Sequence, residues 1–225
     1  MTTLIVGARG NMGAKYVAIL RYLKEPYLLA DLGDLWWEWD FDRVIIATPT
    51  YRHFQDIRLA IIKGRPILCE KPIDKDPIAV MSLADEAQRR GVDVRMVSNW
   101  RFAVNRALER VGEIAVMTEM EIEYRYYNSG NDGFFYDCIQ PIMMAGRFKY
   151  DNLAPVFDCK VNGNPVTLDD FSHSYPMMIS EWMHGDRRKL WSLTDAVKAT
   201  EKVRAAMRLD LNPVSGAVHF TGSMA

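Results

Sequence analysis

Short apolar runs alternate with helical patterns over roughly the first 100 residues of the chain. Residues 3–7 form a branched, apolar run that ends at a glycine-containing turn, and the residues after it place apolar side chains at helical spacing. Further apolar runs follow at 27–30, 43–47, 66–69 and 92–97, with helical spacing at 53–63 and 77–90. Strands and helices that alternate in this way predict βαβ units around a parallel sheet.

The pattern changes after about residue 100. Residues 116–127 alternate charged side chains with apolar or aromatic ones, as in a strand that has one face in water. A helix is predicted at 134–145, a strand at 156–161 that runs into a turn at 162–165, and an amphipathic helix at 193–209. We therefore predict an α/β protein with a doubly wound parallel sheet in residues 1–100 and a second, reduced α+β domain in residues 101–225.

The charge balance gives no sign of a nucleic-acid or membrane partner, because 28 basic and 29 acidic residues leave a formal net charge of -1. No segment approaches the roughly 20 consecutive apolar residues that cross a bilayer, and the N-terminus lacks the features of a signal peptide. The three cysteines, Cys69, Cys138 and Cys159, are widely spaced and predict neither disulfides nor a zinc site. We expect a cytoplasmic protein that acts on a small polar molecule.

The turn after the first predicted strand has the residues of a dinucleotide-binding loop. Gly7, Gly10 and Gly13 are spaced as G-x-x-G-x-x-G, one residue longer between the first pair than the usual fingerprint. Such glycines allow a sharp turn, close approach to a pyrophosphate and tight packing of the following helix. Asp31, after the second strand, can accept hydrogen bonds from the adenosine ribose, which favours NAD. Arg9 could instead pair with the 2′-phosphate of NADP, so NADP stays possible.

Three motifs follow in order along the same region. They are Ala47-Thr48-Pro49 with His53 shortly after it, Glu70-Lys71-Pro72, and Asn99-Trp100-Arg101-Phe102, which we expect to form a turn. In order and spacing, nearly all of residues 1–102 resembles the glucose–fructose oxidoreductase / inositol dehydrogenase (Gfo/Idh/MocA) family, as a short, divergent member. The resemblance implies a Rossmann domain followed by a substrate domain with a mostly antiparallel sheet.

The resemblance also implies roles for individual residues. Residues of the Ala-Thr-Pro motif and His53 would border the ribose and nicotinamide, Glu70 would touch the cofactor, and Lys71 would face the substrate. Pro72 is expected to follow a cis peptide bond. The cofactor site that the loop and the resemblance together indicate comprises Gly7, Arg9, Gly10, Asn11, Met12, Gly13, Asp31, Ala47, Thr48, Pro49, Thr50, His53, Glu70, Lys71, Trp100 and Arg101.

The chain departs from the family at the second catalytic element. That element usually has an aspartate followed, one helical turn later, by a histidine. Here Asp137 fits the acidic position, but Pro141 stands in the place of the histidine. Lys71 with Asp137 could carry proton transfer alone, with Tyr136 or Gln140 binding the reacting oxygen. Asp137 could equally be a helix cap or a salt-bridge partner.

The chain is also shorter than the usual family member, between residues 31 and 44 and again over 103–209. A small sheet with an exposed apolar face needs a cover, which predicts a homodimer or homotetramer that forms through the C-terminal sheet.

Three functions are compatible with these residues. The leading hypothesis is an NAD(P)-dependent dehydrogenase or reductase for a hydroxyl or carbonyl group of a sugar, cyclitol or sugar nucleotide, with Lys71 as the acid/base residue. The second is reduction of a conjugated or imine bond, as in the related biliverdin reductases, where the histidine is dispensable. The third is a catalytically silent protein that binds NAD(H).

Overall fold

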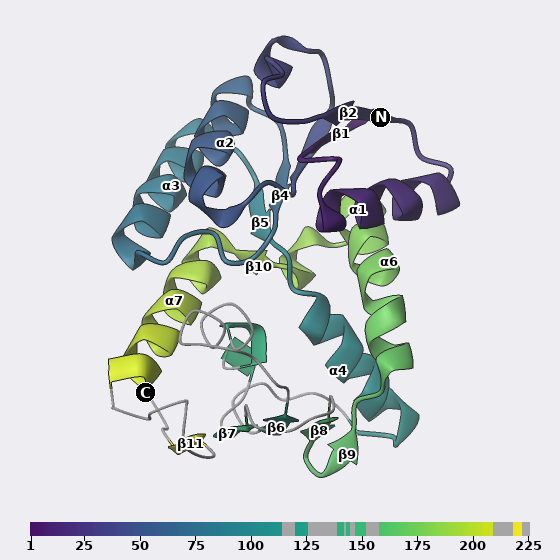
Figure 1. Cartoon of the computed structure of the whole chain (residues 1–225), viewed down its shortest axis with the longest axis vertical. Coiled ribbons are helices and arrows are strands. Elements are labelled where there is room, and N and C mark those ends of the chain that lie inside the picture. Colours follow the sequence, from purple (N-terminus) through teal and green to yellow (C-terminus); the bar gives the residue numbers. More distant parts are fainter. Residues whose placement is uncertain are drawn as a thin grey trace. The chain divides into compact units, whose positions relative to one another are not determined.

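The computed structural model of the chain describes residues 1–113, 120–125, 139–141, 143–144, 147–151, 158–208 and 218–221 (Figure 1). The chain divides into two compact units. The first unit comprises Met1–Val97 and Ile179–Val197, and the second unit comprises Ser98–Met178 and Lys198–Ala225. The sequence suggested a single boundary at residue 100, whereas in the structure a later segment returns to the first unit.

A six-stranded sheet forms the centre of the first unit, in the order β10-β5-β4-β3-β1-β2 (Figure 1). Its parallel strands are β1 (Thr3–Val6), β2 (Tyr27–Ala30), β3 (Arg43–Ile46), β4 (Ile67–Cys69) and β5 (Val94–Met96). The segments between them form α1 (Asn11–Tyr22), the 3-10 helix η1 (Trp36–Glu38), α2 (Thr50–Lys63) and α3 (Pro77–Arg90). The predicted doubly wound parallel sheet is confirmed.

The apolar runs form strands because both faces of the sheet are covered. Every residue of β1, β3 and β4 is buried, which explains why these runs are continuous rather than alternating. α2 and α3 end at glycines in the left-handed conformation, Gly64 with a φ of 68° and Gly91 with a φ of 64°. Asp76 caps α3 by accepting a hydrogen bond from Ile78 N at 3.1 Å. These signals lie within a few residues of each helix, so the sequence alone reveals them.

Residues 179–197 join the first unit through a short strand and a buried arginine. β10 (Trp191–Ser192) pairs antiparallel with β5 at the edge of the sheet. Arg43, only 1% exposed, donates to Met183 O at 3.2 Å, to Thr3 Oγ1 at 2.8 Å and to Glu25 Oε2 at 3.2 Å. Burial lowers the pKa of Arg43, and the negative charge of Glu25 opposes that shift. Residues 179–197, which were predicted to lie in the second domain, are therefore hydrogen-bonded to the first unit.

The second unit has a separate five-stranded sheet in the order β11-β7-β6-β8-β9. Its strands are β6 (Glu121–Arg125), β7 (Arg147–Asp151), β8 (Asp158–Val161), β9 (Asn164–Pro165) and β11 (Val218–Thr221). Among the described strand pairs of this second sheet, only β6–β7 is parallel. The sheet is therefore mostly antiparallel, as the family resemblance implied. Asn162 and Gly163, with φ of 50° and 79°, form the predicted turn between β8 and β9.

Three further helices are α4 (Asn99–Arg110), α6 (Leu168–His184) and α7 (Leu193–Arg208). Residues 99–102 were expected to form a turn, and this was wrong, because they form the first turn of α4. α7 confirms the predicted C-terminal helix, whereas α6 was not predicted. The predicted helix at 134–145 lies mostly outside the described residues, although 139–141 are helical.

Candidate functional site

The loops that follow β1 and β3 meet at the carboxyl edge of the parallel sheet. β2 and β3 lie on opposite sides of β1, so the strand order reverses at this point. Ligands of open α/β sheets bind at such a reversal, outside the carboxyl ends of the strands. The two loops are in close contact there, because a Cβ atom on Gly7 would lie 2.7 Å from Ala47 O. The glycine loop and the Ala47-Thr48-Pro49 motif therefore border one site.

The three loop glycines differ in why a side chain is absent at each position. Gly7 has a φ of 85°, and a Cβ atom on Gly13 would lie 2.0 Å from Gly7 O, so both are required by the fold itself. Gly10 has a φ of -72°, which any residue adopts, and a Cβ atom there would meet its nearest neighbour, Gly7 O, at 3.4 Å. Packing within the protein does not require glycine at position 10, and the position leaves room for the close approach of a bound group.

α1 begins at this loop without a capping side chain and without an acidic residue in its first turn. The backbone N–H groups at a helix N-terminus carry a partial positive charge and suit a phosphate. The residues present therefore fit the pyrophosphate of a dinucleotide, which the N–H groups of Asn11, Met12 and Gly13 would hold beside Gly10.

Asp31 lies directly against the glycine loop. Its Oδ2 atom accepts a hydrogen bond from Arg9 N at 2.8 Å, and its Oδ1 atom accepts one from Leu32 N at 2.8 Å. Because each carboxylate oxygen can accept more than one hydrogen bond, the fixed carboxylate can still receive ribose hydroxyl groups. The residue Arg9 is exposed.

α2 holds the loop after β3 through its own side chains. Thr48 Oγ1 donates to Asp56 Oδ2 at 2.7 Å, and the fully buried Asp56 also pairs with Arg52 at 3.1 Å. His53, 1% exposed, has Nε2 at 2.7 Å from Thr48 O and Nδ1 at 2.8 Å from Pro72 O. α2 thus connects the loop after β3, which continues through Pro49 and Thr50 into the helix, with the loop after β4.

Glu70, Lys71 and Pro72 follow β4 at the neighbouring strand end. The buried Glu70 carboxylate accepts a hydrogen bond from Tyr16 Oη at 2.5 Å and another from Lys71 N at 3.1 Å. Lys71 is partly exposed. The Lys71–Pro72 peptide bond is cis, which confirms the expectation for Pro72.

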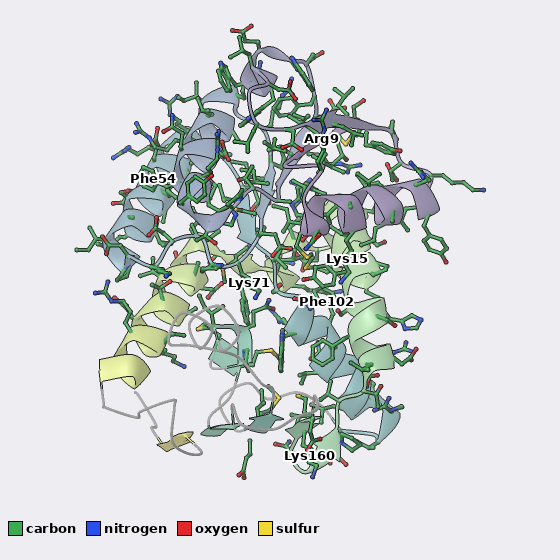
Figure 2. All side chains as sticks on the ribbon, viewed as in Figure 1. Arg9, Lys15, Phe54, Lys71, Phe102 and Lys160 are labelled. Carbon is green, nitrogen blue, oxygen red and sulfur yellow. The ribbon has the colours of Figure 1, made fainter. Side chains whose placement is uncertain are left out.

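A second lysine, Lys15 of α1, is labelled together with Lys71 in Figure 2, and the negative charge of Glu70 acts on it. Partial burial lowers the pKa of Lys15, and the negative charge of Glu70 opposes that shift. Burial also raises the pKa of the Cys69 thiol well above its usual value, with a smaller contribution from the charges of Glu70 and Asp56. The edge of the sheet near Lys71 therefore carries two buried carboxylates, and Cys69 behind it stays a neutral thiol.

Three predicted site residues of the second unit, Trp100, Arg101 and Gln140, lie at or against the first turn of α4. Trp100 N donates to Gln140 Oε1 at 3.1 Å, and Gln140 Nε2 donates to Asn99 Oδ1 at 3.0 Å. Gln140 is only 1% exposed, so its amide is engaged with the start of this helix. Arg101, in the same turn, is partly exposed. The second unit therefore builds a buried amide network where the sequence suggested a group that binds the reacting oxygen.

The other residues predicted for the second catalytic element include two whose positions are not described. Tyr136 and Asp137 lie outside the described residues. Pro141, which stands in the place of the family histidine, is buried and helical.

Sequence reasoning missed Tyr16, Asp56 and Lys15. Tyr16 follows Gly13 by about one helical turn, and Asp56 follows His53 in the same way, so each lies on the helix face that carries the motif residue. For Tyr16 and Asp56 the available signal was a polar residue on the buried face of a predicted helix, whereas Lys15 lies at an exposed position. None of the three belongs to a motif, and for this reason they were not singled out.

Within the described ranges, no group of three His, Cys, Asp or Glu side chains is placed to hold a metal ion. No helix in the described part of the chain combines the length and apolar character needed to cross a bilayer.

Comparisons with known proteins agree with this geometry. Residues 22–98 match the model of an oxidoreductase family that is described as having an NAD-binding Rossmann fold, GFO_IDH_MocA. The chain is 24% identical over 153 residues to the rhizopine catabolism protein MocA of Rhizobium meliloti. That match covers 68% of this chain but only 41% of the relative's length.

Several solved structures share the fold over most of both chains. A probable dehydrogenase from Thermotoga maritima has a TM-score of 0.75 at 14% identity and covers 97% of this chain and 98% of its own. A putative myo-inositol dehydrogenase from Sinorhizobium meliloti has a TM-score of 0.72 at 16% identity, with 92% and 96% covered. The WlbA (WbpB) dehydrogenase from Thermus thermophilus, solved with NAD and UDP-GlcNAcA, has a TM-score of 0.69 at 13% identity, with 92% and 94% covered.

The family match spans β2 to β5, and it contains the Ala47-Thr48-Pro49 and Glu70-Lys71-Pro72 motifs whose loops border the site. Over residues 22–98 the Rossmann domain of this chain is therefore similar to that of the GFO_IDH_MocA oxidoreductases.

Proposed function

We propose that this protein binds NAD(H) and transfers a hydride between the nicotinamide and a hydroxyl or carbonyl group of a small polar substrate. The observation that carries the proposal is the juxtaposition of an open Gly10 and an uncapped α1 with the loop that contains Lys71, all on one edge of one sheet. A phosphate-binding loop next to a lysine that can exchange protons suits nicotinamide-dependent redox chemistry.

NAD, rather than NADP, is the expected cofactor. The Asp31 carboxylate is fixed against the loop by Arg9 N and Leu32 N, where it would accept hydrogen bonds from the ribose and repel a 2′-phosphate. Fluorescence titration with NADH and NADPH tests this choice. Tight binding of NADPH together with weak binding of NADH would show that the exposed Arg9, and not Asp31, decides cofactor selection.

Lys71 supplies the acid/base chemistry in this proposal. NAD, when bound, would supply the acceptor for a hydride, with its two electrons, from the carbinol carbon of the substrate. Lys71, as the neutral amine, takes the proton of the substrate hydroxyl at Nζ, and the carbon–oxygen bond becomes a carbonyl. In the reverse direction the Lys71 ammonium returns that proton to the oxygen as the carbon receives the hydride.

The substrate class is proposed from the relatives. Their names refer to myo-inositol, to rhizopine catabolism and to a complex with UDP-GlcNAcA, all of which point to polyhydroxylated molecules. We therefore expect a sugar, a cyclitol or a sugar nucleotide.

A Lys71→Ala variant tests the activity. We expect kcat to fall by about 100-fold or more, the usual contribution of a positioned acid/base group, while the affinity for NADH stays within a factor of about two. Turnover is measured as NADH formation with a panel of polyols, and Lys63→Ala, at an exposed position of α2, is the control. An unchanged kcat in Lys71→Ala would remove Lys71 from the proposed mechanism.

Pro141 favours a second candidate, the reduction of a conjugated or imine bond. A proline side chain has no proton to give, so this chain lacks the group that usually assists the lysine in oxidation of an alcohol. This alternative predicts oxidation of NADH or NADPH by unsaturated or imine acceptors, with no polyol oxidised. A protein that binds NADH but turns over neither class would be a silent binder.

We also propose that the protein is a homodimer or homotetramer assembled through the β11-β7-β6-β8-β9 sheet. Ile122 and Val161 are buried on this small sheet, which needs a cover for any apolar face left exposed. Light scattering that shows a monomer at micromolar concentration would contradict this.

A further inference from the structure

The loop that carries Lys71 begins where the hydrogen-bonded ladder between β3 and β4 stops. The ladder pairs Ile46 with Cys69, and Glu70 N still donates to Ile46 O at 2.9 Å. The next backbone N–H after Ile46, that of Ala47, donates instead to Val6 O of β1, on the other side of β3, at 2.8 Å. Side chains must therefore set the distance between the two loops beyond this point.

One side chain spans that distance. The His53 ring lies between the two loops, with Nε2 at 2.7 Å from Thr48 O and Nδ1 at 2.8 Å from Pro72 O. Both partners are carbonyl oxygens, which only accept, so the ring must be the donor. A neutral imidazole carries one N–H and donates to one carbonyl, whereas a ring that carries both protons donates to both. At 1% exposure, water does not compete for these contacts.

The end of the bridge at Thr48 is itself fixed. Thr48 donates from its hydroxyl to the buried Asp56, which also pairs with Arg52. The hydroxyl and the carbonyl oxygen of Thr48 thus both contact side chains of α2, so the His53 ring links Pro72 to a residue that is itself fixed. The other flank of Lys71 is held by Glu70, whose carboxylate accepts from Tyr16 Oη and from Lys71 N.

We propose that His53 is a positioning residue: its ring, carried by α2 and lying against the Thr48 carbonyl, donates to the Pro72 carbonyl and so fixes the backbone that presents Lys71. With only 1% of its surface exposed, His53 acts in this proposal through the backbone of the Glu70-Lys71-Pro72 triplet. The part of this proposal that concerns turnover rests on the proposed oxidoreductase function, whereas the part that concerns backbone order does not.

The first test needs neither cofactor nor substrate. The chain has four histidines, so ¹⁵N-histidine labelling gives a simple NMR spectrum. We expect one imidazole N–H proton that is protected from exchange with solvent and that disappears in His53→Phe. Absence of a protected imidazole proton in the unmodified protein would overturn the bridge.

The second test separates the two contacts. In Asn the amide nitrogen takes the position of Nδ1 and can still donate to Pro72 O, whereas in Gln it takes the position of Nε2 and can donate only to Thr48 O. Hydrogen exchange of the backbone amides of residues 70–76, followed by mass spectrometry, should therefore stay near the original rate in His53→Asn. It should rise by about tenfold in His53→Gln and in His53→Phe, the factor expected for one lost buried hydrogen bond.

The matched control is Gln55→Asn, at an exposed position of the same helix, which should leave exchange unchanged. Circular dichroism identifies any variant that fails to fold, and the Asn and Gln variants, which keep a polar donor, preserve the comparison if the Phe variant is lost. Equal exchange rates in folded His53→Asn and His53→Gln would overturn the proposal.

The third test connects the bridge to turnover. With the substrate found by the polyol panel, His53→Gln should lower kcat by about tenfold with little change in KM or NADH affinity, and His53→Asn should keep kcat within about threefold. An equal kcat in both variants would refute the positioning role. If the unmodified protein turns over no substrate, the proposed function fails, and the NMR and exchange tests still decide whether the bridge exists.

Discussion

Two helices of this molecule, α2 and α4, start close to predicted site residues but are held in place in different ways. α2 binds the loop before it with its own side chains: His53 and Asp56 contact Thr48 at separations of 5 and 8 residues. α4 is held instead by Gln140, which lies 40 and 41 residues beyond its partners Trp100 and Asn99. The first arrangement is carried by one short segment, whereas the second requires a distant part of the chain to fold against the helix.

The two arrangements also differ in electrostatic character. The first unit buries the Asp56 and Glu70 carboxylates beside its loops and pairs them with Thr48, Arg52 and Tyr16. The start of α4 relies on neutral amides. Removing a partner of a buried charge costs more free energy than removing a neutral hydrogen bond, so the first unit should respond more strongly to substitution.

The largest effect is expected at Gly13. A Cβ atom in Gly13→Ala would lie 2.0 Å from Gly7 O and 2.7 Å from Ala8 Cα, and neither backbone atom can move freely. We expect a loss of about 3 kcal/mol or more in the free energy of unfolding, measured in urea. Gly10→Ala is the control, because a Cβ atom there has room, and it should leave stability almost unchanged but weaken NADH binding. Comparable stability of the two variants would contradict the packing argument.

Arg43→Met tests whether residues 179–197 belong energetically to the first unit. It removes the donors to Met183 O, Thr3 Oγ1 and Glu25 Oε2 at a buried position. We expect a loss of about 3 kcal/mol in the free energy of unfolding, because three acceptors lose a buried charged donor, although Glu25 keeps its contact with His184 at 2.8 Å. Arg65→Met, at a partly exposed ion pair with Asp40, should change stability by less than about 1 kcal/mol. A similar loss in both variants would argue against the arginine link.

Tyr16→Phe tests the buried carboxylate next to Lys71. It removes the hydroxyl that donates to Glu70 and leaves the ring in place. We expect a loss of about 2 kcal/mol in the free energy of unfolding, the value of a hydrogen bond to a charged group. Tyr22→Phe, 79% exposed on the same helix, should have no measurable effect. Thermal unfolding of both variants measures this difference in stability.

Gln140→Leu tests the start of α4 and should have the smallest effect. It removes the acceptor for Trp100 N and the donor to Asn99 Oδ1. We expect a loss of about 1 kcal/mol, because both bonds are neutral. Gln88→Leu at an exposed position of α3 is the control. If Gln140→Leu lowers the free energy of unfolding more than Tyr16→Phe does, the first unit is not the more sensitive of the two units to loss of a buried hydrogen bond.

Much of the first unit could be predicted from local signals. Continuous apolar runs mark β1, β3 and β4, and glycines at the ends of α2 and α3 mark where those helices stop. The second unit was harder. Asn99 to Phe102 was expected to be a turn because of the family resemblance, whereas these residues form the first turn of α4. α6 contains Pro176, a residue that disfavours a helix interior, and it was not predicted.

The residues of the candidate site likewise divide into those predicted from local sequence signals and those that only the structure brings together. The sequence by itself determined that a glycine loop, Asp31 and the Glu70-Lys71-Pro72 triplet would follow successive strands, because each depends on neighbouring residues and on the direction of a parallel strand. Only the tertiary structure decided that His53 faces two carbonyl oxygens, that Tyr16 reaches Glu70 and that Ile179–Val197 returns to the first sheet. Those contacts join segments far apart in the chain, and they form only when the packed core has fixed the distance between them.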